Sequence, residues 1–388
     1  MPIPRIAAPL TALLLMAVLL LPALVACSQL PAATTEPANT ELVQATNLAL
    51  ITEALELIGE EYVVPDDVDS KALMRGALKG MVDALDDPYS AYLDITQFGM
   101  TLEDLSGSFQ GIGAFVGDDE GRIMIIAPIP GTPAEAAGVR SGDVIVGIDG
   151  DSTEGLSVMD AVLLIRGDAG TTVVLQIIHD GDTESVDIAI VRAEIDVPSV
   201  YFEMNGSVGH ITLANFGERT AAELADALED ISSKGATGII LDMRRNPGGL
   251  LKSVVDVAGY FLDDGLVVSV IDNRGQRRDS AVNSRTRTYN LPIVVLVSQY
   301  SASGAEVLAG ALQDYDRAVV AGQTTFGKGS VNMLFELDDG SGLYLTIARW
   351  YTPDGRLIEG EGIVPDYVLD PEADDVVEWA LDFLANRQ

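Results

Sequence analysis

A serine-rich segment directly after an apolar run is the first place in this sequence that could support covalent chemistry. Residues 293–297 are all apolar, the next nine residues read S-Q-Y-S-A-S-G-A-E, and a helix is expected to begin near Ala305. A serine in such a turn lies at a helix N-terminus, where free N–H groups and the positive end of the dipole favour an alkoxide or an oxyanion. Serine is also a common helix cap, so this loop alone does not separate a nucleophile from a cap.

A lysine between two glycines follows in the next loop. Residues 322–331 read G-Q-T-T-F-G-K-G-S-V, which places Lys328 among apolar and glycine neighbours. Burial of an amine lowers the pKa of lysine and frees the neutral base, and a lysine that activates a serine is a known alternative to the histidine–aspartate pair. A single loop lysine is more often a solvated charge, so the two loops must be interpreted together.

Composition limits the other kinds of chemistry. The chain has 388 residues with 23 basic and 59 acidic side chains, a net charge of −36, which argues against nucleic acid as a partner. Its one cysteine, Cys27, excludes an intrachain disulfide, and its two histidines, His179 and His210, occur in patterns typical of structural or exposed residues. No H-E-x-x-H motif is present, which argues against a metallopeptidase, and we expect no metal or other cofactor.

The N-terminal segment has the features of an export signal. Residues 6–25 are almost wholly apolar, follow Arg5 and lead into L-V-A-C at residues 24–27, which resembles the lipobox of bacterial lipoproteins. We therefore predict a signal peptide over residues 1–26, lipidation of Cys27 and a flexible tether over residues 27–41. An uncleaved membrane anchor is the alternative, and either places the rest of the chain outside the cytoplasm, in the cell envelope.

The elements that must position the two loops follow from periodicity, and they predict an α+β multidomain chain. Helical spacing indicates an N-terminal helical region over residues 42–100, and short β-like runs between glycine turns indicate a β-rich module over residues 101–195 with one helix near 158–165. Over residues 196–370 apolar strands alternate with amphipathic helices. This alternation predicts an α/β core with a mixed, largely parallel sheet, whose ligands gather beyond the carboxyl ends of the strands. Residues 371–388 are expected to form a helix that packs on the body or on a second subunit.

Read together, the two loops resemble those of the carboxyl-terminal processing proteases, also called tail-specific proteases. These are serine endopeptidases with a serine–lysine dyad and a crotonase-like core. S-A-S-G-A-E at residues 301–306 is similar to the family's S-A-S-A-S-E, F-G-K-G-S-V at 326–331 matches its lysine loop, and the separation of 328 − 303 = 25 residues is the family's spacing. The resemblance implies that Ser303 is the nucleophile and Lys328 the general base.

The same resemblance assigns further site residues. The family often has a glutamine four residues after the lysine, where it orients the amine, and this sequence has Asn332. D-M-R-R-N-P-G-G-L at residues 242–250 is similar to the family's D-L-R-x-N-P-G-G-L, and a backbone N–H of this turn, at Gly248 or Gly249, is expected to form the oxyanion hole with that of Gly304.

Four motifs in the β-rich module resemble a PDZ domain: Q-G-I-G-A-F at residues 110–115, P-A-E-A-A-G-V at 133–139, G-D-V-I at 142–145 and I-D-G at 148–150. Such a domain takes up an extended peptide as an added strand, and its glycine loop, here Gly111, Ile112, Gly113 and Ala114, binds the terminal carboxylate. The apolar helix near 158–165 predicts an apolar tail. Arg166 follows it, and either couples peptide binding to activation or is a surface arginine.

Further family motifs occur at both ends of the body, so the resemblance extends from about residue 42 to 369. They are L-D-D-P-Y-S-A-Y-L at residues 85–93, A-R-W-Y-T-P-D-G-R at 348–356 and G-I-V-P-D at 362–366. The sequence thus predicts a lipid-anchored, extracytoplasmic endopeptidase that captures proteins by apolar C-terminal tails. The alternative is a non-catalytic PDZ-type receptor for such tails at the membrane. A homo-oligomer and an activating partner are left open.

Overall fold

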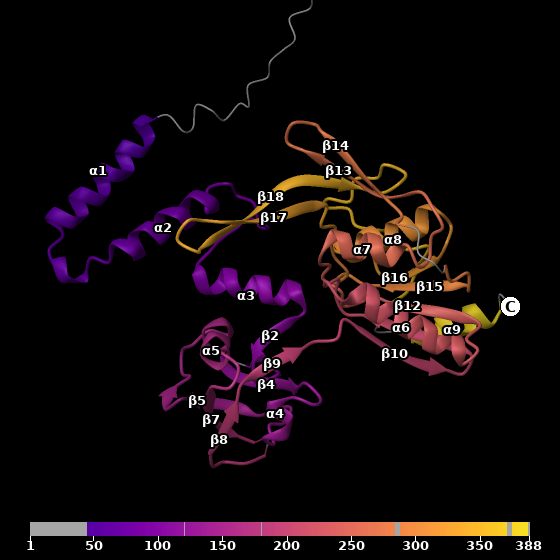
Figure 1. Cartoon of the computed structure of the whole chain (residues 1–388), viewed down its shortest axis with the longest axis horizontal. Coiled ribbons are helices and arrows are strands. Elements are labelled where there is room, and N and C mark those ends of the chain that lie inside the picture. Colours follow the sequence, from indigo (N-terminus) through magenta and orange to yellow (C-terminus); the bar gives the residue numbers. More distant parts are fainter. Residues whose placement is uncertain (1–44, 120, 180, 284–287, 371–374, 387–388) are drawn as a thin grey trace, which may run out of the picture. The chain divides into compact units, whose positions relative to one another are not determined.

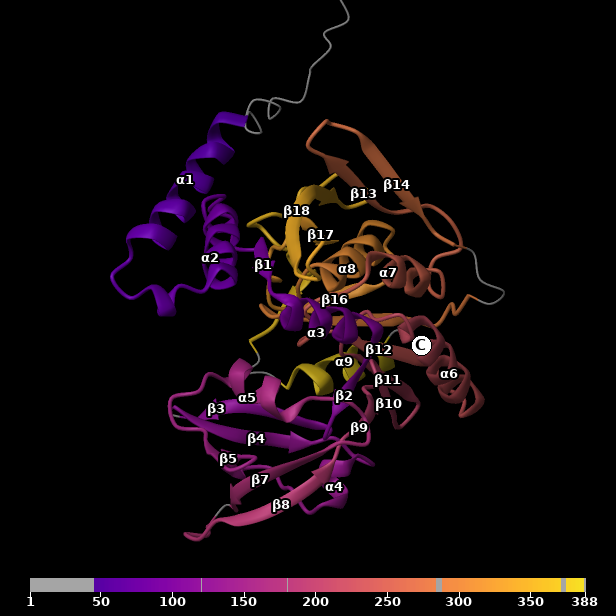
Figure 2. The same cartoon turned by 60° about the vertical axis from the view of Figure 1, so that its left-hand side comes forward.

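The computed structural model describes residues 45–119, 121–179, 181–283, 288–370 and 375–386 (Figures 1 and 2). The predicted signal peptide, the tether and Cys27 lie outside the described residues. The chain divides into two compact units, residues 1–62 and 63–388. Among the described helices, none has both the length and the apolar character needed to cross a membrane.

The N-terminal region is helical, as the spacing of its apolar residues predicts. In the first unit the described element is α1 (Ala45–Glu61). The second unit begins with a short 3-10 turn (Pro65–Asp67) and continues through α2 (Ser70–Asp83), β1 (Ala91–Leu93) and α3 (Ile95–Ser106). Helix α2 starts where it does because the carboxylate of Asp69 accepts the N–H of Lys71 at 2.8 Å and so caps the first turn.

The β-rich module folds around its own small core. Strand β2 (Ser108–Gly111) pairs with β9 (Ala193–Asp196), and a separate sheet has the order β3-β4-β5-β7-β8, with β6 paired to β5. Its elements are β3 (Ala114–Asp119), β4 (Arg122–Pro128), α4 (Pro133–Ala136), β5 (Val144–Ile148), β6 (Asp151–Ser152), α5 (Val158–Ile165), β7 (Thr172–Ile178) and β8 (Val186–Val191). Because β3 is at the edge of this sheet, its outer side has no strand partner in the described residues.

The α/β core contains the mixed, largely parallel sheet that the sequence predicts. Its order is β10-β11-β12-β15-β16-β19, and only the β10–β11 pair is antiparallel among these neighbours. The strands are β10 (Val200–Asn205), β11 (Val208–Leu213), β12 (Gly238–Asp242), β15 (Ile293–Val297), β16 (Val319–Gly322) and β19 (Tyr367–Val368). The helices are α6 (Thr220–Ser233), α7 (Leu251–Ala258), α8 (Gly304–Asp314) and α9 (Val376–Ala385).

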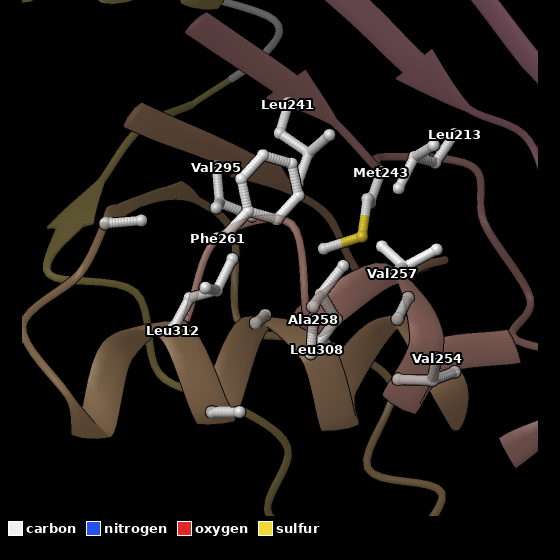
Figure 3. Close-up of a cluster of buried hydrophobic side chains, with 14 of the residues drawn as sticks. Leu213, Leu241, Met243, Val254, Val257, Ala258, Phe261, Val295, Leu308 and Leu312 are labelled. Atoms are coloured by element: carbon white, nitrogen blue, oxygen red, sulfur yellow. The ribbon is translucent and has the colours of Figure 1, made fainter. Parts of the chain in front are cut away.

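Alternate residues of these strands face two different layers. Leu241 faces the core that α6, α7 and α8 share with the sheet, and Figure 3 shows its side chain near those of Phe261 and Val295. Ile240, its neighbour on β12, packs on the opposite face with Ala380 and Leu384 of α9. The C-terminal helix therefore packs on the body of its own chain, which is one of the two placements that the sequence left open.

A second, antiparallel sheet joins β1 to strands that follow and precede the elements of the α/β core. Its order is β1-β18-β13-β14, with β17 also paired to β18, and Ala91 of β1 lies opposite Tyr344 of β18. The strands beyond β1 are β13 (Leu266–Asp272), β14 (Arg277–Ala281), β17 (Ser330–Glu336) and β18 (Gly342–Tyr351). This sheet matters for the site because β17 begins directly after the lysine loop.

Candidate active site

The predicted nucleophile lies in a tight turn between β15 and α8. Ser303 has φ 49° and ψ −111°, a backbone conformation outside the common regions for a residue with a side chain. Two nearby serines bond this turn to the segment after β12. The hydroxyl of Ser301 donates to the carbonyl of Met243 at 2.8 Å, and that of Ser298 donates to the carbonyl of Arg244. The strained turn is therefore tied to the segment that follows β12.

The glycine turn after β12 approaches Ser303 more closely than any side chain would allow. Gly248 has φ 103°, and a Cβ atom there would lie 2.7 Å from the nitrogen of Gly304 and 2.8 Å from the Cβ of Ser303. Gly249 has φ 142°, and a Cβ atom there would lie 2.3 Å from the backbone oxygen of Phe216. Both positions therefore require glycine for steric reasons.

Only some of the predicted oxyanion donors are free to bind a ligand. The N–H of Gly248 donates to the side-chain oxygen of Asn246 at 2.8 Å. In the described part of the chain nothing accepts the N–H groups of Gly249 and Gly304, and both residues line the same cavity as Ser303. The structure thus offers Gly249 and Gly304 as a pair of donors, while Gly248 permits the close approach of the two turns.

Lys328 projects from the loop between β16 and β17, and its side chain is half-buried. Burial lowers the pKa of its amine, while the carboxylates of Asp87, Glu359 and Glu306 raise it less, so the pKa lies below its ordinary value. The backbone around it is fixed, because Trp350 Nε1 donates to the carbonyl of Lys328 at 2.8 Å. The electrostatics expected of a lysine base are therefore present.

Ser303, Gly249, Gly304, Lys328 and Asn332 line one cavity of about 330 Å³. Its wall is largely apolar and comes from α3, α7, α8, β17 and β18, with Leu105, Leu251, Val307, Leu334, Tyr344 and Trp350 among its residues. The two loops that the sequence analysis interpreted together are thus brought together at one site. An apolar wall around a hydroxyl and an amine is suited to an apolar segment of a peptide chain.

Glu306 connects the two loops, a role that was not predicted from the sequence. Its side chain is fully buried, and its carboxylate accepts the N–H groups of Ser303 at 2.7 Å, Lys328 at 2.9 Å and Gly327 at 2.7 Å. It also accepts the hydroxyl of Thr325 at 2.5 Å. Burial raises the pKa of Glu306 despite these four hydrogen bonds. An acidic residue three positions after a serine at a helix start, as in a capping box, was the signal that could have identified it.

Asn332 does not bond to the amine of Lys328 in this structure. Its Nδ2 donates to the carbonyl of Tyr89 at 2.8 Å and to Thr346 Oγ1 at 3.1 Å, and its Oδ1 accepts the hydroxyl of Ser330 at 3.2 Å. The amide thus links the segment before β1 to β17 and β18. It lies in the cavity wall, but its polar atoms bind other groups.

A charged cluster supports the glycine turn from the α9 side of the sheet. Arg244 Nη2 donates to Asp242 at 2.6 Å, and Asp242 also lies 3.2 Å from His210 Nε2. Burial alone would raise the pKa of Asp242, but the hydrogen bonds from His210 and Arg244 and the guanidinium charge lower it to about 2. His210 therefore belongs to the cluster with Asp242 and Arg244. The other histidine, His179, bonds to Asp143 at 2.8 Å in the β-rich module.

The predicted peptide-binding loop lines a second cavity, of about 300 Å³, together with apolar residues of α5. Ile112, Gly113 and Ala114 contribute to it, and Gly111 ends the preceding strand β2. Gly113 has φ 79°, and a Cβ atom there would lie 2.4 Å from the Cβ of Thr132, so the loop requires glycine at this position.

Arg166, at the end of α5, lies in the wall of the same cavity. Its guanidinium is 4.4 Å above the ring of Phe109 and 3.5 Å from the carboxylate of Glu103 on α3. It is therefore a packed residue with a charged partner in the helical region.

As for metals, the described residues contain no group of three or more His, Cys, Asp or Glu side chains close enough to hold an ion.

Comparison with protein families identifies three consecutive segments. Residues 25–96 match the N-terminal domain of the activating protease CtpB, residues 99–190 match a PDZ domain, and residues 207–369 match peptidase family S41. The order of the segments is the order in which the helical region, the β-rich module and the α/β core occur along the chain.

Curated relatives match over most of the chain. The carboxy-terminal processing protease CtpA of Bacillus subtilis is 40% identical over 332 residues, which cover 84% of this chain and 71% of that protein. The carboxy-terminal-processing protease of Bartonella bacilliformis is 38% identical over 341 residues, which cover 86% of this chain and 77% of that protein.

Solved structures agree in fold. The photosystem II D1 C-terminal processing protease is 31% identical, with a TM-score of 0.53, and the match covers 85% of this chain and 94% of that one. An S41 protease from Bacteroides fragilis, at 19% identity and a TM-score of 0.54 over 86% of this chain and 97% of that one, shares the fold. These similarities show that the chain belongs to the carboxy-terminal processing protease family, which are serine peptidases of family S41 that carry a PDZ domain.

Proposed function

We propose that this chain is an endopeptidase in which Ser303 is the nucleophile and Lys328 the general base. The observation that supports this best is the shared cavity: Ser303, a half-buried lysine of lowered pKa, Gly249 and Gly304 line the same apolar site, and no group in the described residues accepts the N–H of either glycine. These are a nucleophile, a base and a pair of oxyanion donors, the minimum set for acyl transfer.

The reaction follows from these groups. Ser303 Oγ attacks the peptide carbonyl carbon while its proton passes to the neutral Nζ of Lys328, and the N–H groups of Gly249 and Gly304 stabilise the oxyanion. The C–N bond then breaks, and the ammonium of Lys328 gives its proton to the leaving amine. Lys328 next takes a proton from water, which attacks the acyl-enzyme, and the second collapse returns a proton to Ser303 Oγ.

Substrates are proposed to enter through their C-terminal tails. Strand β3 is at the edge of its sheet, so its outer side can pair with an extended peptide, and the adjoining cavity is lined by apolar residues of β3 and α5. An apolar tail whose carboxylate binds the loop of residues 111–114 fits this arrangement. The match of residues 25–96 to the CtpB N-terminal domain supports a partner that acts through the helical region.

The proposal places the enzyme in the cell envelope, anchored by lipid on Cys27. It rests on the apolar run and the L-V-A-C segment of the sequence. Metabolic labelling with a radioactive fatty acid should mark the full-length chain and not a Cys27→Ser variant. Labelling of neither chain would leave the uncleaved anchor as the explanation of the apolar run.

The decisive experiment compares the full-length chain in detergent with its Ser303→Ala and Lys328→Ala variants. The substrate is an unstructured protein with an apolar tail, followed by gel electrophoresis and mass spectrometry. We expect cleavage by the unaltered chain, none by either variant, and unchanged tail binding by Ser303→Ala. Cleavage that survives both substitutions in folded protein would contradict the dyad. Tail binding without cleavage by any of the three would favour the receptor.

A further inference from the structure

The amine of Lys328 lies over the rings of two tyrosines. Nζ lies 4.9 Å from the ring centroid of Tyr89 and 5.9 Å from that of Tyr344. Within the residues that the structure describes, no hydrogen bond or ion pair reaches this nitrogen. Tyr89 also makes an edge contact with Phe326, at 6.5 Å between ring centroids, in the same loop as Lys328.

The two tyrosines are held in place by the antiparallel sheet. Tyr89 lies two residues before Ala91, the first residue of β1, and Ala91 lies opposite Tyr344 of β18. The carbonyl of Tyr89 accepts a hydrogen bond from Asn332, and its neighbour Ser90 accepts the backbone N–H of Thr346 at 3.0 Å. A segment far from Lys328 in the sequence is thereby fixed next to its amine.

Aromatic faces suit a lysine that must give up its proton. A ring attracts an ammonium by about 0.5 to 2 kcal/mol, while a carboxylate in direct contact in a partly buried site would hold the proton more strongly. A ring face also has no polar hydrogen or strong acceptor to compete for the amine once it is neutral. Two rings can therefore orient the amine and leave its lone pair available to Ser303.

We propose that Tyr89, together with Tyr344, is a positioning residue that holds the amine of Lys328 in the cavity, and that Asn332 acts through the Tyr89 carbonyl rather than on the amine. This inference rests on the proposed serine–lysine function. It assigns to an aromatic pair the orienting role that the sequence alone had given to Asn332.

The kinetic test compares Tyr89→Leu with Tyr89→Phe in the full-length chain. A cation–π loss of about 0.5 to 2 kcal/mol corresponds to about a 2- to 30-fold fall in kcat, with KM little changed, and the phenylalanine variant should retain the activity of the unaltered chain. Tyr201→Leu, an exposed tyrosine on β10, is the matched control and should have no effect. A leucine variant with unchanged kcat would overturn the proposal.

A double-mutant cycle tests the role of Asn332. If Asn332 acts through Tyr89, the Asn332→Ala substitution should lower kcat little further in a chain that already has Tyr89→Leu. Effects that multiply would show that Asn332 acts on the amine by a separate route and would overturn that part of the proposal.

A spectroscopic test of the same proposal, by NMR of the lysine side chains, does not depend on cleavage. The chain has five lysines, Lys71, Lys79, Lys234, Lys252 and Lys328, so selective ¹³C labelling of lysine Cε gives few signals, and Lys328→Arg assigns one of them. Ring currents should displace the Lys328 signal, Tyr89→Leu should reduce this displacement, and Tyr89→Phe should keep it.

Lys234, whose amine lies 5.7 Å from the ring of Phe202, provides the internal control and should not respond to either Tyr89 substitution. If the unaltered chain cleaves nothing, the proposed function fails, and the signal of Lys328 alone decides the aromatic placement. A Lys328 signal that is the same in all Tyr89 variants would overturn the placement.

Discussion

Ser303 combines a hydroxyl side chain with an uncommon backbone conformation. The other described non-glycine residues of positive φ are Asp86, Asp149 and Asp316, a type that tolerates the left-handed region in turns. Ser303 differs because its ψ of −111° lies outside that region as well. Such a residue costs about 1 to 3 kcal/mol, and the contacts of the serine turn and of Glu306 offset this cost. The strain places the hydroxyl at the start of α8, next to the free N–H groups.

The pH dependence of cleavage should follow the amine of Lys328. Because burial lowers its pKa below the ordinary 10.5, neutral amine becomes available as pH rises through the lowered pKa, and kcat/KM should rise with it. At lower pH the ammonium cannot accept the Ser303 proton, so activity should fall. The measurement is kcat/KM against pH with a short fluorogenic peptide.

Lys328→Arg provides the control for this profile. The guanidinium stays protonated throughout the accessible range, so this variant should lose about 10²- to 10⁴-fold in activity without regaining it at high pH. A profile of the unaltered chain that is flat from acid to alkaline pH would contradict Lys328 as the base.

Glu306→Gln should separate the two loops without removing a catalytic group. The amide has one acceptor oxygen, while the carboxylate uses both oxygens to accept bonds from both loops. Losing one or two charge-assisted hydrogen bonds of about 1.5 to 3 kcal/mol each predicts a fall in kcat of about tenfold or more. The check is kcat together with urea unfolding. Unchanged kcat in a folded variant would show that the loops keep their register without Glu306.

At the scale of elements, the glycine turn between β12 and α7 limits what the site tolerates. Gly248→Ala should lower activity at least 100-fold, because its Cβ would overlap the Gly304 nitrogen and because φ 103° is unfavourable for alanine. The matched control is Gly80→Ala in α2, where no heavy atom lies within 4 Å of the added carbon. That change should raise stability by about 0.5 to 1 kcal/mol and leave cleavage unchanged.

Strong local periodicity explains which elements were predictable. The apolar run at residues 293–297 and the helix at residues 158–165 are observed as β15 and α5. Strands β17 and β18 were not predicted, because β17 follows a loop motif and their register depends on pairing with each other and with β1. Pairing between segments this far apart leaves no periodic signal in either of them.

The same distinction applies to the site. Ser303 and Lys328 could be predicted as a pair because short motifs surround each of them, and the structure places both in one cavity. Glu306 and Tyr89 were within quoted motifs, but their contacts depend on how two loops and a sheet meet, which spacing does not encode. For Asn332 the sequence position suggested a bond to the amine of Lys328. Its side chain instead donates to the carbonyl of Tyr89.

For the whole molecule, the proposed function separates capture of the tail from hydrolysis. The peptide-binding loop and Ser303 line different cavities, so damage to one should leave the chemistry of the other intact. Gly113→Val should therefore impair processing of a tailed protein and not cleavage of a short peptide. The reason is local, since Gly113 has φ 79° and an added Cβ would overlap Thr132.

The test measures both reactions with the same preparations. For Gly113→Val we expect KM for the tailed protein to rise at least tenfold, with cleavage of the short peptide within about twofold of normal. Amidation of the tail should have a similar effect on the unaltered chain, because losing a charged acceptor costs about 1.5 to 3 kcal/mol. Val186→Thr, at an exposed position of β8, is the control. If Gly113→Val abolished cleavage of both substrates in folded protein, tail binding would be required for the catalytic site to function.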